Sequence, residues 1–98
     1  MNLLLGIDLG TSSVKVALVN GDDLSVIKSS SAEYPIFGDQ PGYAEQAPNA
    51  WWQAIVQATK AVTVGQDPKL IRGIGVDGQM HGLVCADSDG QPVRPAII

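Results

Sequence analysis

The alternation of apolar and polar positions predicts a sheet whose first three strands follow one another directly. Residues 3–9 form a nearly continuous apolar run, which is typical of a strand buried on both faces of a mixed sheet. Residues 14–19 form a second apolar run, and a weaker third run over residues 24–31 follows the strong turn signal NGDD at residues 20–23. Since short connections join antiparallel neighbours, we expect a three-stranded antiparallel meander.

A single amphipathic helix is predicted after the meander. Residues 32–47 form a long connection first, and loops of that length are usually functional or docked elsewhere. Pro48 suits the first turn of a helix. The predicted apolar face recurs at helical spacing, at Trp51, Ile55, Ala58 and Val62. Gly65 and the Asp-Pro pair at residues 67–68 are expected to end this helix.

A fourth strand and a closing hairpin complete the predicted elements. Residues 71–76 are again apolar, and because a helix leads into them this strand should lie parallel to a neighbour. Residues 83–86 and 93–97 are expected to pair as a terminal hairpin around the turn DSDG at residues 87–90. The whole pattern predicts an α/β fold.

The composition fits one small domain and excludes one class of partner. Hydrophobic residues make up 45% of the 98 positions and charged residues only 16%. So low a charged fraction, against an average of about 25%, fits a piece whose flanks pack against more protein. The net charge is −4 and the 6 Lys and Arg residues form no cluster. Non-specific nucleic-acid binding needs several neighbouring cations, so we exclude it.

The single cysteine permits no internal disulfide. Cys85 lies between apolar residues, and we interpret it as a small buried hydrophobe. The first residues lack the basic segment of a signal peptide. No apolar run approaches the roughly 20 residues that span a membrane. We therefore expect a cytoplasmic protein without a membrane partner.

The segment GIDLGTSS at residues 6–13 carries the first candidate chemistry. Asp8 interrupts the apolar run just before the turn, where an unpaired carboxylate would be costly to bury. Gly10 lets the backbone approach a ligand, and the amides and hydroxyls of Thr11, Ser12 and Ser13 can form an anion-binding concavity. A carboxylate beside such a cradle indicates Mg²⁺–nucleotide chemistry. The same residue types are ordinary turn formers, so the local pattern alone is equally consistent with a plain hairpin.

Two further segments offer polar side chains near this turn. Lys15 either neutralises phosphate charge or belongs to a solvated face, and the alternation of its strand slightly favours the solvated face. The segment GQMHG at residues 78–82 follows the fourth strand, and ligands of α/β sheets bind beyond the carboxyl ends of strands. Gln79 and His81 supply donors and acceptors suited to sugar hydroxyls. A lone histidine in a glycine-rich loop is, however, more often an ordinary polar residue.

Taken together, these segments resemble the FGGY carbohydrate kinases. Residues 6–13 resemble the first phosphate-binding hairpin of the actin, hexokinase and Hsp70 superfamily, in the form found in that family. The stretch GYAEQAPNAWW at residues 42–52 resembles the family segment in which Glu-Gln-x-Pro precedes a Trp-Trp helix. Residues 78–82 resemble the sugar-binding segment of the family's xylulokinase branch. The resemblance covers essentially the whole chain in the right order.

Two positions depart from the family pattern, and three others near them need an interpretation. Ala47 stands where relatives usually carry Asp, which removes a helix N-cap at a cost of about 1 kcal/mol. Asp77 stands where a small residue is expected, and it could alter sugar preference or contact a neighbouring loop. We interpret Trp51 as a core residue. Glu45 and Gln46 are interpreted as loop organisers or cleft-lining residues.

The resemblance implies a ribonuclease-H-like α/β domain that is incomplete, with residues 1–98 forming an N-terminal fragment. It implies ATP-dependent phosphorylation of a ketopentose, D-xylulose to D-xylulose 5-phosphate. Asp8 would then be catalytic and orient Mg²⁺, while residues 10–13 and Lys15 face the transferring phosphate. Gln79, Met80 and His81 would seat the ketose.

The same resemblance places the general base and the adenosine pocket further along the parent chain. The fragment alone should then be inactive, and its partners would be the rest of the kinase, the sugar and ATP. A homodimer of the parent is left open. Gluconokinase, ribulokinase and glycerol kinase types remain alternatives within the family. An alternative of another class is a free-standing, non-catalytic sugar-binding module.

Overall fold

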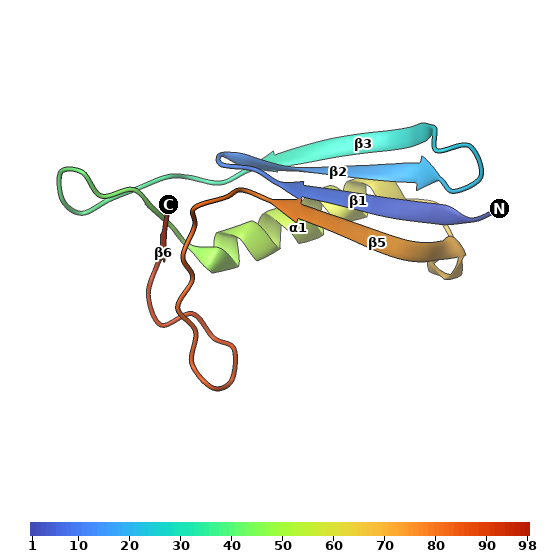
Figure 1. The fold of residues 1–98 in the computed structure, drawn as a ribbon. Helices are drawn as coiled ribbons and strands as arrows, with labels where there is room; N and C mark the ends of the chain where they lie inside the picture. The colour runs from blue at the N-terminus through green and yellow to red at the C-terminus, as the bar shows by residue number, and fades with distance from the viewer.

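The computed structural model describes residues 1–98 as a four-stranded mixed sheet with one long helix against it (Figure 1). The strands of this sheet lie in the order β3-β2-β1-β5, and a separate small sheet pairs β4 with β6. The strands are β1 Leu3–Leu9, β2 Ser13–Asn20, β3 Val26–Glu33, β4 Glu45–Gln46, β5 Ile71–Gly78 and β6 Ala96–Ile97. The helix α1 spans Pro48–Thr63, and a short 3-10 helix, η1 Pro68–Leu70, leads into β5.

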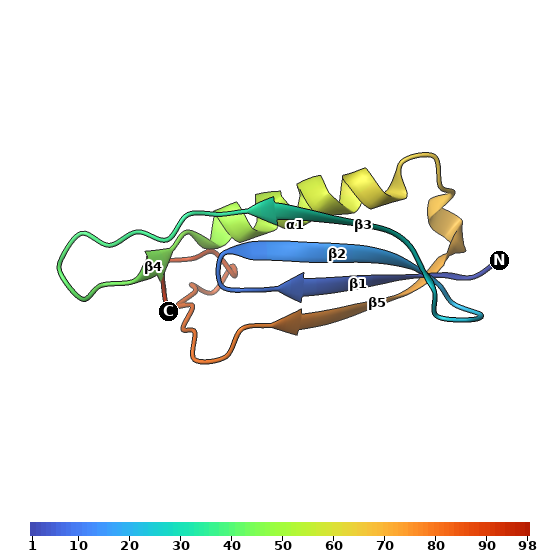
Figure 2. The same ribbon diagram turned by 90° about the horizontal axis from the view of Figure 1, so that it is seen from above.

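Strand β1 lies inside the sheet and joins its antiparallel and parallel parts. It pairs antiparallel with β2 and parallel with β5, while β2 pairs antiparallel with β3. The predicted meander, crossover helix and parallel strand are therefore confirmed. Because β1 and β5 run in the same direction, their carboxyl ends lie together, on the side where the β1–β2 turn and the β4–β6 pair also lie (Figure 2).

The core lies between this sheet and α1. Side chains of a strand alternate between its two faces, whereas those of a helix recur every three to four positions. One buried cluster accordingly joins alternate strand residues to one helix face, through Leu3, Leu5, Val14, Val16, Leu18, Ala54, Ala58 and Val62. Trp51 and Ile55 of the predicted apolar face are partly buried against the same cluster.

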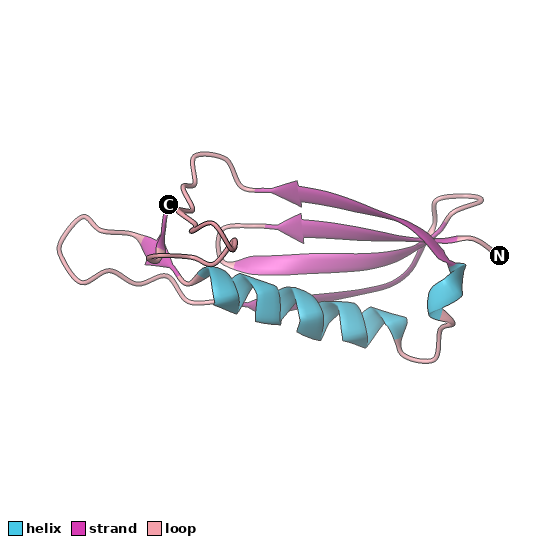
Figure 3. Ribbon diagram, turned by 90° about the horizontal axis from the view of Figure 1, so that it is seen from below, coloured by secondary structure: helices cyan, strands magenta, loops and turns pink.

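Only one face of the sheet is covered. Helix α1 packs on β2 and β3 (Figure 3), and no helix lies on the opposite face. Leu4 is half-buried for this reason, so the expectation that the first strand is buried on both faces is wrong for residues 1–98. Beyond the reach of α1, Ile74 and Val76 of β5 remain 63% and 71% exposed.

Several strand boundaries differ from the predicted ones by one or two residues, and two of these differences change where a named residue lies. Strand β3 begins at Val26, because Leu24 has a left-handed backbone with a φ of 62° and belongs to the preceding turn. The N–H of Leu24 donates to the carbonyl of Asn20 at 2.8 Å, which closes that turn. Strand β5 continues to Gly78, so Asp77 lies within the sheet and not in the following loop.

The predicted terminal hairpin around residues 87–90 is present, but its two arms are not regular strands. The two arms are joined by the isolated antiparallel bridges Leu83↔Ile97 and Ala86↔Pro92, and the N–H of Val93 also donates to the Cys85 carbonyl at 3.0 Å. Pro92 and Pro95 lack the N–H donors that a continuous ladder requires. Strand β6 also pairs antiparallel with β4, which lies in the long connection. Cys85, which lies in this hairpin and is predicted to be buried, is only half-buried.

Both ends of α1 agree with the sequence. Pro48 occupies the first turn, and the capping residue Ala47 makes no side-chain hydrogen bond. After the C-cap residue Val64, Gly65 takes a left-handed φ of 78°, a common way to end a helix. Neither α1 nor η1 has the length and apolar character needed to cross a membrane.

We expect Ala47→Asp to stabilise the protein by about 1 kcal/mol. The backbone of Ala47 is already extended, with φ −82° and ψ 118°, and a carboxylate there would accept an N–H from the first turn of α1. Urea unfolding of the wild type and the variant measures the gain. Ala47→Leu is the control without an acceptor, and an equal change in both variants would contradict a capping effect.

Candidate functional site

The carboxyl end of β1 places charged side chains on the uncovered face of the sheet. In the register, Asp8 lies opposite Lys15 of β2 and beside Asp77 of β5, and all three residues are exposed. Asp8 and Lys15 form no ion pair, since the one ion pair of the structure joins two other residues. A hollow of about 320 Å³ along this face is lined by Gly6, Ile7, Asp8, Lys15, Ala17 and Gly75. The small residues leave room beside Asp8.

Tyr34, just after β3, holds two of the four carbonyls in the turn between β1 and β2. Its hydroxyl donates to the Gly10 carbonyl, and its backbone N–H donates to the Ser12 carbonyl at 3.1 Å. Tyr34 is only 5% exposed and belongs to the core cluster. Burial, and after it the negative charge of Asp8, raise the pKa of the Tyr34 hydroxyl above its ordinary value of 10.0. The turn is therefore anchored to the core by a neutral phenol.

Gln46 and the turn itself hold the other two carbonyls. Nε2 of Gln46 donates to the Thr11 carbonyl at 2.6 Å, and the N–H of Gly10 donates to the Ser13 carbonyl at 2.9 Å. A Cβ at position 10 would lie 3.0 Å from that Ser13 oxygen, so the tightness of the turn itself favours glycine there. All four carbonyls of residues 10–13 thus accept hydrogen bonds from the chain.

The N–H groups of two of these peptides point away from the core. In a planar trans peptide the N–H points away from the carbonyl to which it is bonded. With the carbonyls of Gly10 and Thr11 held by the core, the N–H groups of Thr11 and Ser12 point away from it, and neither donates to a backbone carbonyl. Outward N–H groups next to the hydroxyls of the same exposed residues can bind an anion such as a phosphate.

Gln46 also connects the turn to two other parts of the chain. It is fully buried, and its Oε1 accepts from Nε1 of Trp51 at 3.0 Å and from Nε2 of Gln79 at 3.4 Å. The N–H of Gln79 donates to the Leu9 carbonyl at 3.0 Å, which keeps the loop after β5 beside the end of β1. The interpretation of Gln46 as a loop organiser is confirmed.

The other two predicted sugar-binding residues, Met80 and His81, are exposed. Met80 is 80% exposed, and the exposed His81 has a left-handed φ of 61°, which is uncommon for a residue other than glycine. The structure therefore brings Asp8, Lys15 and the turn together with Gln79. It leaves the side chains of Met80 and His81 free in the adjoining loop.

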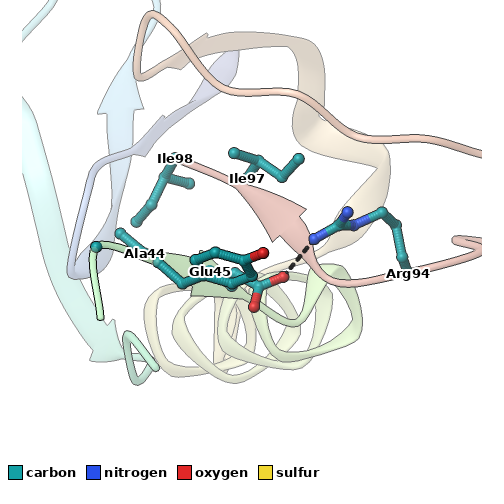
Figure 4. A pocket seen from close by; sticks show the side chains of 7 residues that line it. Ala44, Glu45, Arg94, Ile97 and Ile98 are labelled. Carbon is teal, nitrogen blue, oxygen red and sulfur yellow. Dashed lines mark hydrogen bonds and ion pairs between the residues drawn. The ribbon is translucent and has the colours of Figure 1, made fainter. Parts of the chain in front are cut away.

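An ion pair between a buried carboxylate and a partly exposed guanidinium fixes β4, the strand that carries Gln46. The Arg94 guanidinium contacts Oε2 of Glu45 at 2.6 Å beside a cavity of about 220 Å³ (Figure 4). The side chain of Glu45 is 7% exposed and that of Arg94 is 43% exposed. Since a buried carboxylate without a partner is costly, Arg94 holds Glu45, and with it the neighbouring Gln46, in place.

The donor set fits a divalent cation bound jointly with a phosphate. No three His, Cys, Asp or Glu side chains gather anywhere in the chain, so a cage made only of protein side chains is absent. Mg²⁺ is commonly held by one or two carboxylates together with substrate phosphates. Asp8 supplies such a carboxylate, exposed next to the outward N–H groups of the turn.

Sequence reasoning missed Tyr34, which it left in the long connection between the third strand and the helix. The available signal was weak: Tyr34 continues the alternation of buried Ala32 along β3. Its acceptor, the Gly10 carbonyl, lies 24 residues away, and no local pattern indicates such a contact. The ion pair of Glu45 with Arg94 was missed for the same reason, since 49 residues separate its members.

Comparisons with known proteins identify the family of the chain. Residues 3–98 match the profile of the FGGY family of carbohydrate kinases, N-terminal domain. The xylulose kinase of Staphylococcus epidermidis is 42% identical over 99 residues, which cover 98% of this chain and 20% of that protein. The xylulose kinase of Bacillus subtilis is 43% identical over 100 residues, which cover 100% of this chain and 20% of that protein. The chain thus spans about a fifth of the length of these relatives.

A solved structure shows the same architecture. The crystal structure of a xyloylose kinase from Brucella ovis superposes with a TM-score of 0.88 at 35% identity. The match covers 99% of this chain and 21% of that one. The expected ribonuclease-H-like α/β fold, that of the actin and hexokinase superfamily, is thereby confirmed.

We expect Tyr34→Phe to lower the stability at neutral pH by about 1 kcal/mol, because the Gly10 carbonyl loses its donor. The pKa of Tyr34 is raised in the folded state. Its contribution is therefore complete below the unfolded pKa of about 10 and is lost as the pH rises through the folded pKa. Urea unfolding at about pH 8 and about pH 10.5 should show a steeper alkaline loss for the wild type than for the variant.

The exposed Tyr43 offers a matched control for this measurement, since its hydroxyl makes no hydrogen bond. Tyr43→Phe should keep the alkaline loss of the wild type. An identical pH dependence in wild type and Tyr34→Phe would contradict the role of the Tyr34 hydroxyl.

Proposed function

Because the chain belongs to the FGGY family of carbohydrate kinases, we propose that it is the N-terminal part of an ATP-dependent kinase that phosphorylates a ketopentose. D-xylulose, converted to D-xylulose 5-phosphate, is the favoured substrate, since the matched relatives are named xylulose kinases. The observation that carries the proposal is the turn at residues 10–13, whose carbonyls are held inward while the N–H groups of Thr11 and Ser12 lie free beside Asp8.

In the proposed reaction a sugar hydroxyl attacks the γ-phosphorus of ATP. A new oxygen–phosphorus bond forms as the bond to the bridging oxygen breaks and ADP leaves, and catalysis rests mainly on positioning and charge stabilisation. The N–H groups of Thr11 and Ser12 would bind the oxygens of the transferring phosphate, with the hydroxyls of Thr11, Ser12 and Ser13 beside them. Lys15 would add positive charge. When bound, Mg²⁺ neutralises phosphate charge, and Asp8 would hold it or its water ligands.

The loop after β5 would seat the sugar. Gln79 and His81 offer hydrogen-bonding groups to the sugar hydroxyls, and the exposed Met80 offers an apolar contact. The left-handed backbone of His81 supports a role in binding, because such strained conformations cluster at functional sites.

Residues 1–98 would form part of the first domain of the parent kinase. The attacking hydroxyl must lose a proton, and we assign the general base, an Asp, and the adenosine pocket to residues beyond 98. The isolated chain should therefore not turn over. Its proposed partners are the sugar, ATP and the rest of the kinase, and the use of ATP favours the cytoplasm as the compartment.

We expect Asp8→Ala in the intact kinase to abolish phosphorylation of D-xylulose with little loss of stability, since Asp8 is exposed and unpaired. A coupled assay of ADP release measures the activity, and thermal unfolding measures the stability. Asp22, exposed in the β2–β3 turn at the other end of the sheet, supplies the control: Asp22→Ala should retain full activity. Turnover by Asp8→Ala at the wild-type rate would rule out the assigned role.

The substrate assignment has its own test. The intact kinase should show a kcat/KM for D-xylulose at least roughly tenfold above those for D-gluconate, D-ribulose and glycerol. A hydroxyl-binding loop discriminates through hydrogen bonds that the wrong sugar leaves unmade. A comparable preference for one of the other three would transfer the proposal to that branch of the family.

A further inference from the structure

We propose that Gln46 is a positioning residue that holds the phosphate-binding turn and the sugar loop at a set separation, an inference that rests on the proposed kinase function. A single buried amide contacts both. Its Nε2 donates to the Thr11 carbonyl at 2.6 Å, and its Oε1 accepts from Gln79 at 3.4 Å. No other side chain in the structure contacts both segments through hydrogen bonds.

The partners of Gln46 determine the orientation of its amide. The indole N–H of Trp51 can only donate, so Oε1 must face it, at 3.0 Å. The Thr11 carbonyl can only accept, so Nε2 must face the turn. Because Gln46 is 0% exposed, water cannot replace either partner. Neither a carboxylate nor an apolar side chain of the same length can satisfy both sides at once.

The backbone that carries Gln46 is itself held on both sides. Glu45 exchanges two backbone hydrogen bonds with Phe37, at 2.9 and 2.7 Å, and its carboxylate contacts Arg94. Strand β6 pairs with β4 along its other edge. Gln46 therefore projects from a fixed strand, and a shift of the turn or of the loop must break one of its hydrogen bonds.

This arrangement matters because phosphoryl transfer depends on the distance between the two substrates. The Thr11 carbonyl belongs to the peptide whose N–H, on Ser12, would bind the phosphate, while Gln79 lies in the loop that would bind the sugar. A misplacement of about 1 Å between reacting groups can cost on the order of a hundredfold in rate. Gln46 would thus act on the rate through Thr11 and Gln79, without touching either substrate.

The first test uses Gln46→Met in the intact kinase, with Gln57→Met as the matched control on the exposed side of α1. Two rates are measured: ketose phosphorylation and ATP hydrolysis without sugar. For Gln46→Met we expect the ratio of the first rate to the second to fall by about tenfold or more, since sugar and phosphate lose their alignment. Gln57→Met should keep the wild-type ratio. A role limited to folding would lower both rates in proportion and leave the ratio unchanged.

The second test uses Gln46→Glu and the pH profile of kcat. A protonated carboxyl can donate to the Thr11 carbonyl and accept from Trp51, whereas a carboxylate can only accept. None of the groups that hydrogen-bond to Gln46 titrates: they are the Thr11 carbonyl, the Trp51 indole and the Gln79 amide. We expect the kcat of the variant, relative to wild type, to rise by about tenfold between about pH 8 and about pH 6, because burial favours the protonated form.

The outcomes separate the two proposals. The positioning role alone would be overturned by the following result. The wild type phosphorylates D-xylulose, Gln46→Glu is equally active at both pH values, and Gln46→Met keeps the wild-type ratio of the two rates. A wild type that phosphorylates no sugar would overturn the proposed function and the positioning role with it. Recovery of Gln46→Glu at low pH, together with the fall in ratio for Gln46→Met, would establish the positioning role.

Discussion

The hydrogen bonds to the four carbonyls of the β1–β2 turn are the interactions on which the candidate site depends. Two carbonyls are held by Tyr34, one by Gln46 and one by the turn's own Gly10 N–H. Because a trans peptide presents its N–H opposite to its carbonyl, this inner layer of bonds directs the outer N–H groups. A buried polar group without a partner is costly, so the direction of the turn is coupled to the packing of the core.

The topology of the sheet then places other chemistry beside the turn. Strands β1 and β5 run parallel, so Asp8 and the loop that begins at Gln79 reach the same end of the sheet. Helix α1 packs against β2 and β3 on one side of the sheet (Figure 1) and leaves the opposite face, to which Asp8 belongs, without a helix. The long connection supplies β4, which pairs with β6 and carries Gln46 into the space between turn and loop. A segment without regular periodicity thus becomes the link between the two halves of the site.

The elements predicted from the sequence are those whose signal is local. Val14, Val16 and Leu18 are fully buried as alternation requires, and α1 begins at Pro48 and ends before Gly65. Where the structure differs from the prediction, the cause is also local. The apolar side chain of Leu24 predicts a strand position, but its left-handed backbone places it in the preceding turn. Residues 83–86 and 93–97 are predicted as the two strands of a hairpin, but Pro92 and Pro95 interrupt the ladder and limit their pairing to isolated bridges.

The sequence by itself determined the order and type of the main elements, and it indicated Asp8, residues 10–13 and Gln79 as a group with related chemistry. Hydrophobic period and turn composition suffice for this, because they act between residues that are close along the chain. Only the tertiary structure decided what holds these residues. The contact of Tyr34 with Gly10 spans 24 residues, that of Gln46 with Thr11 spans 35, and that of Arg94 with Glu45 spans 49. Each is a directional bond between polar groups that come into contact only when the strands and the helix have packed. Contacts between residues so far apart along the chain produce no periodic pattern in the sequence.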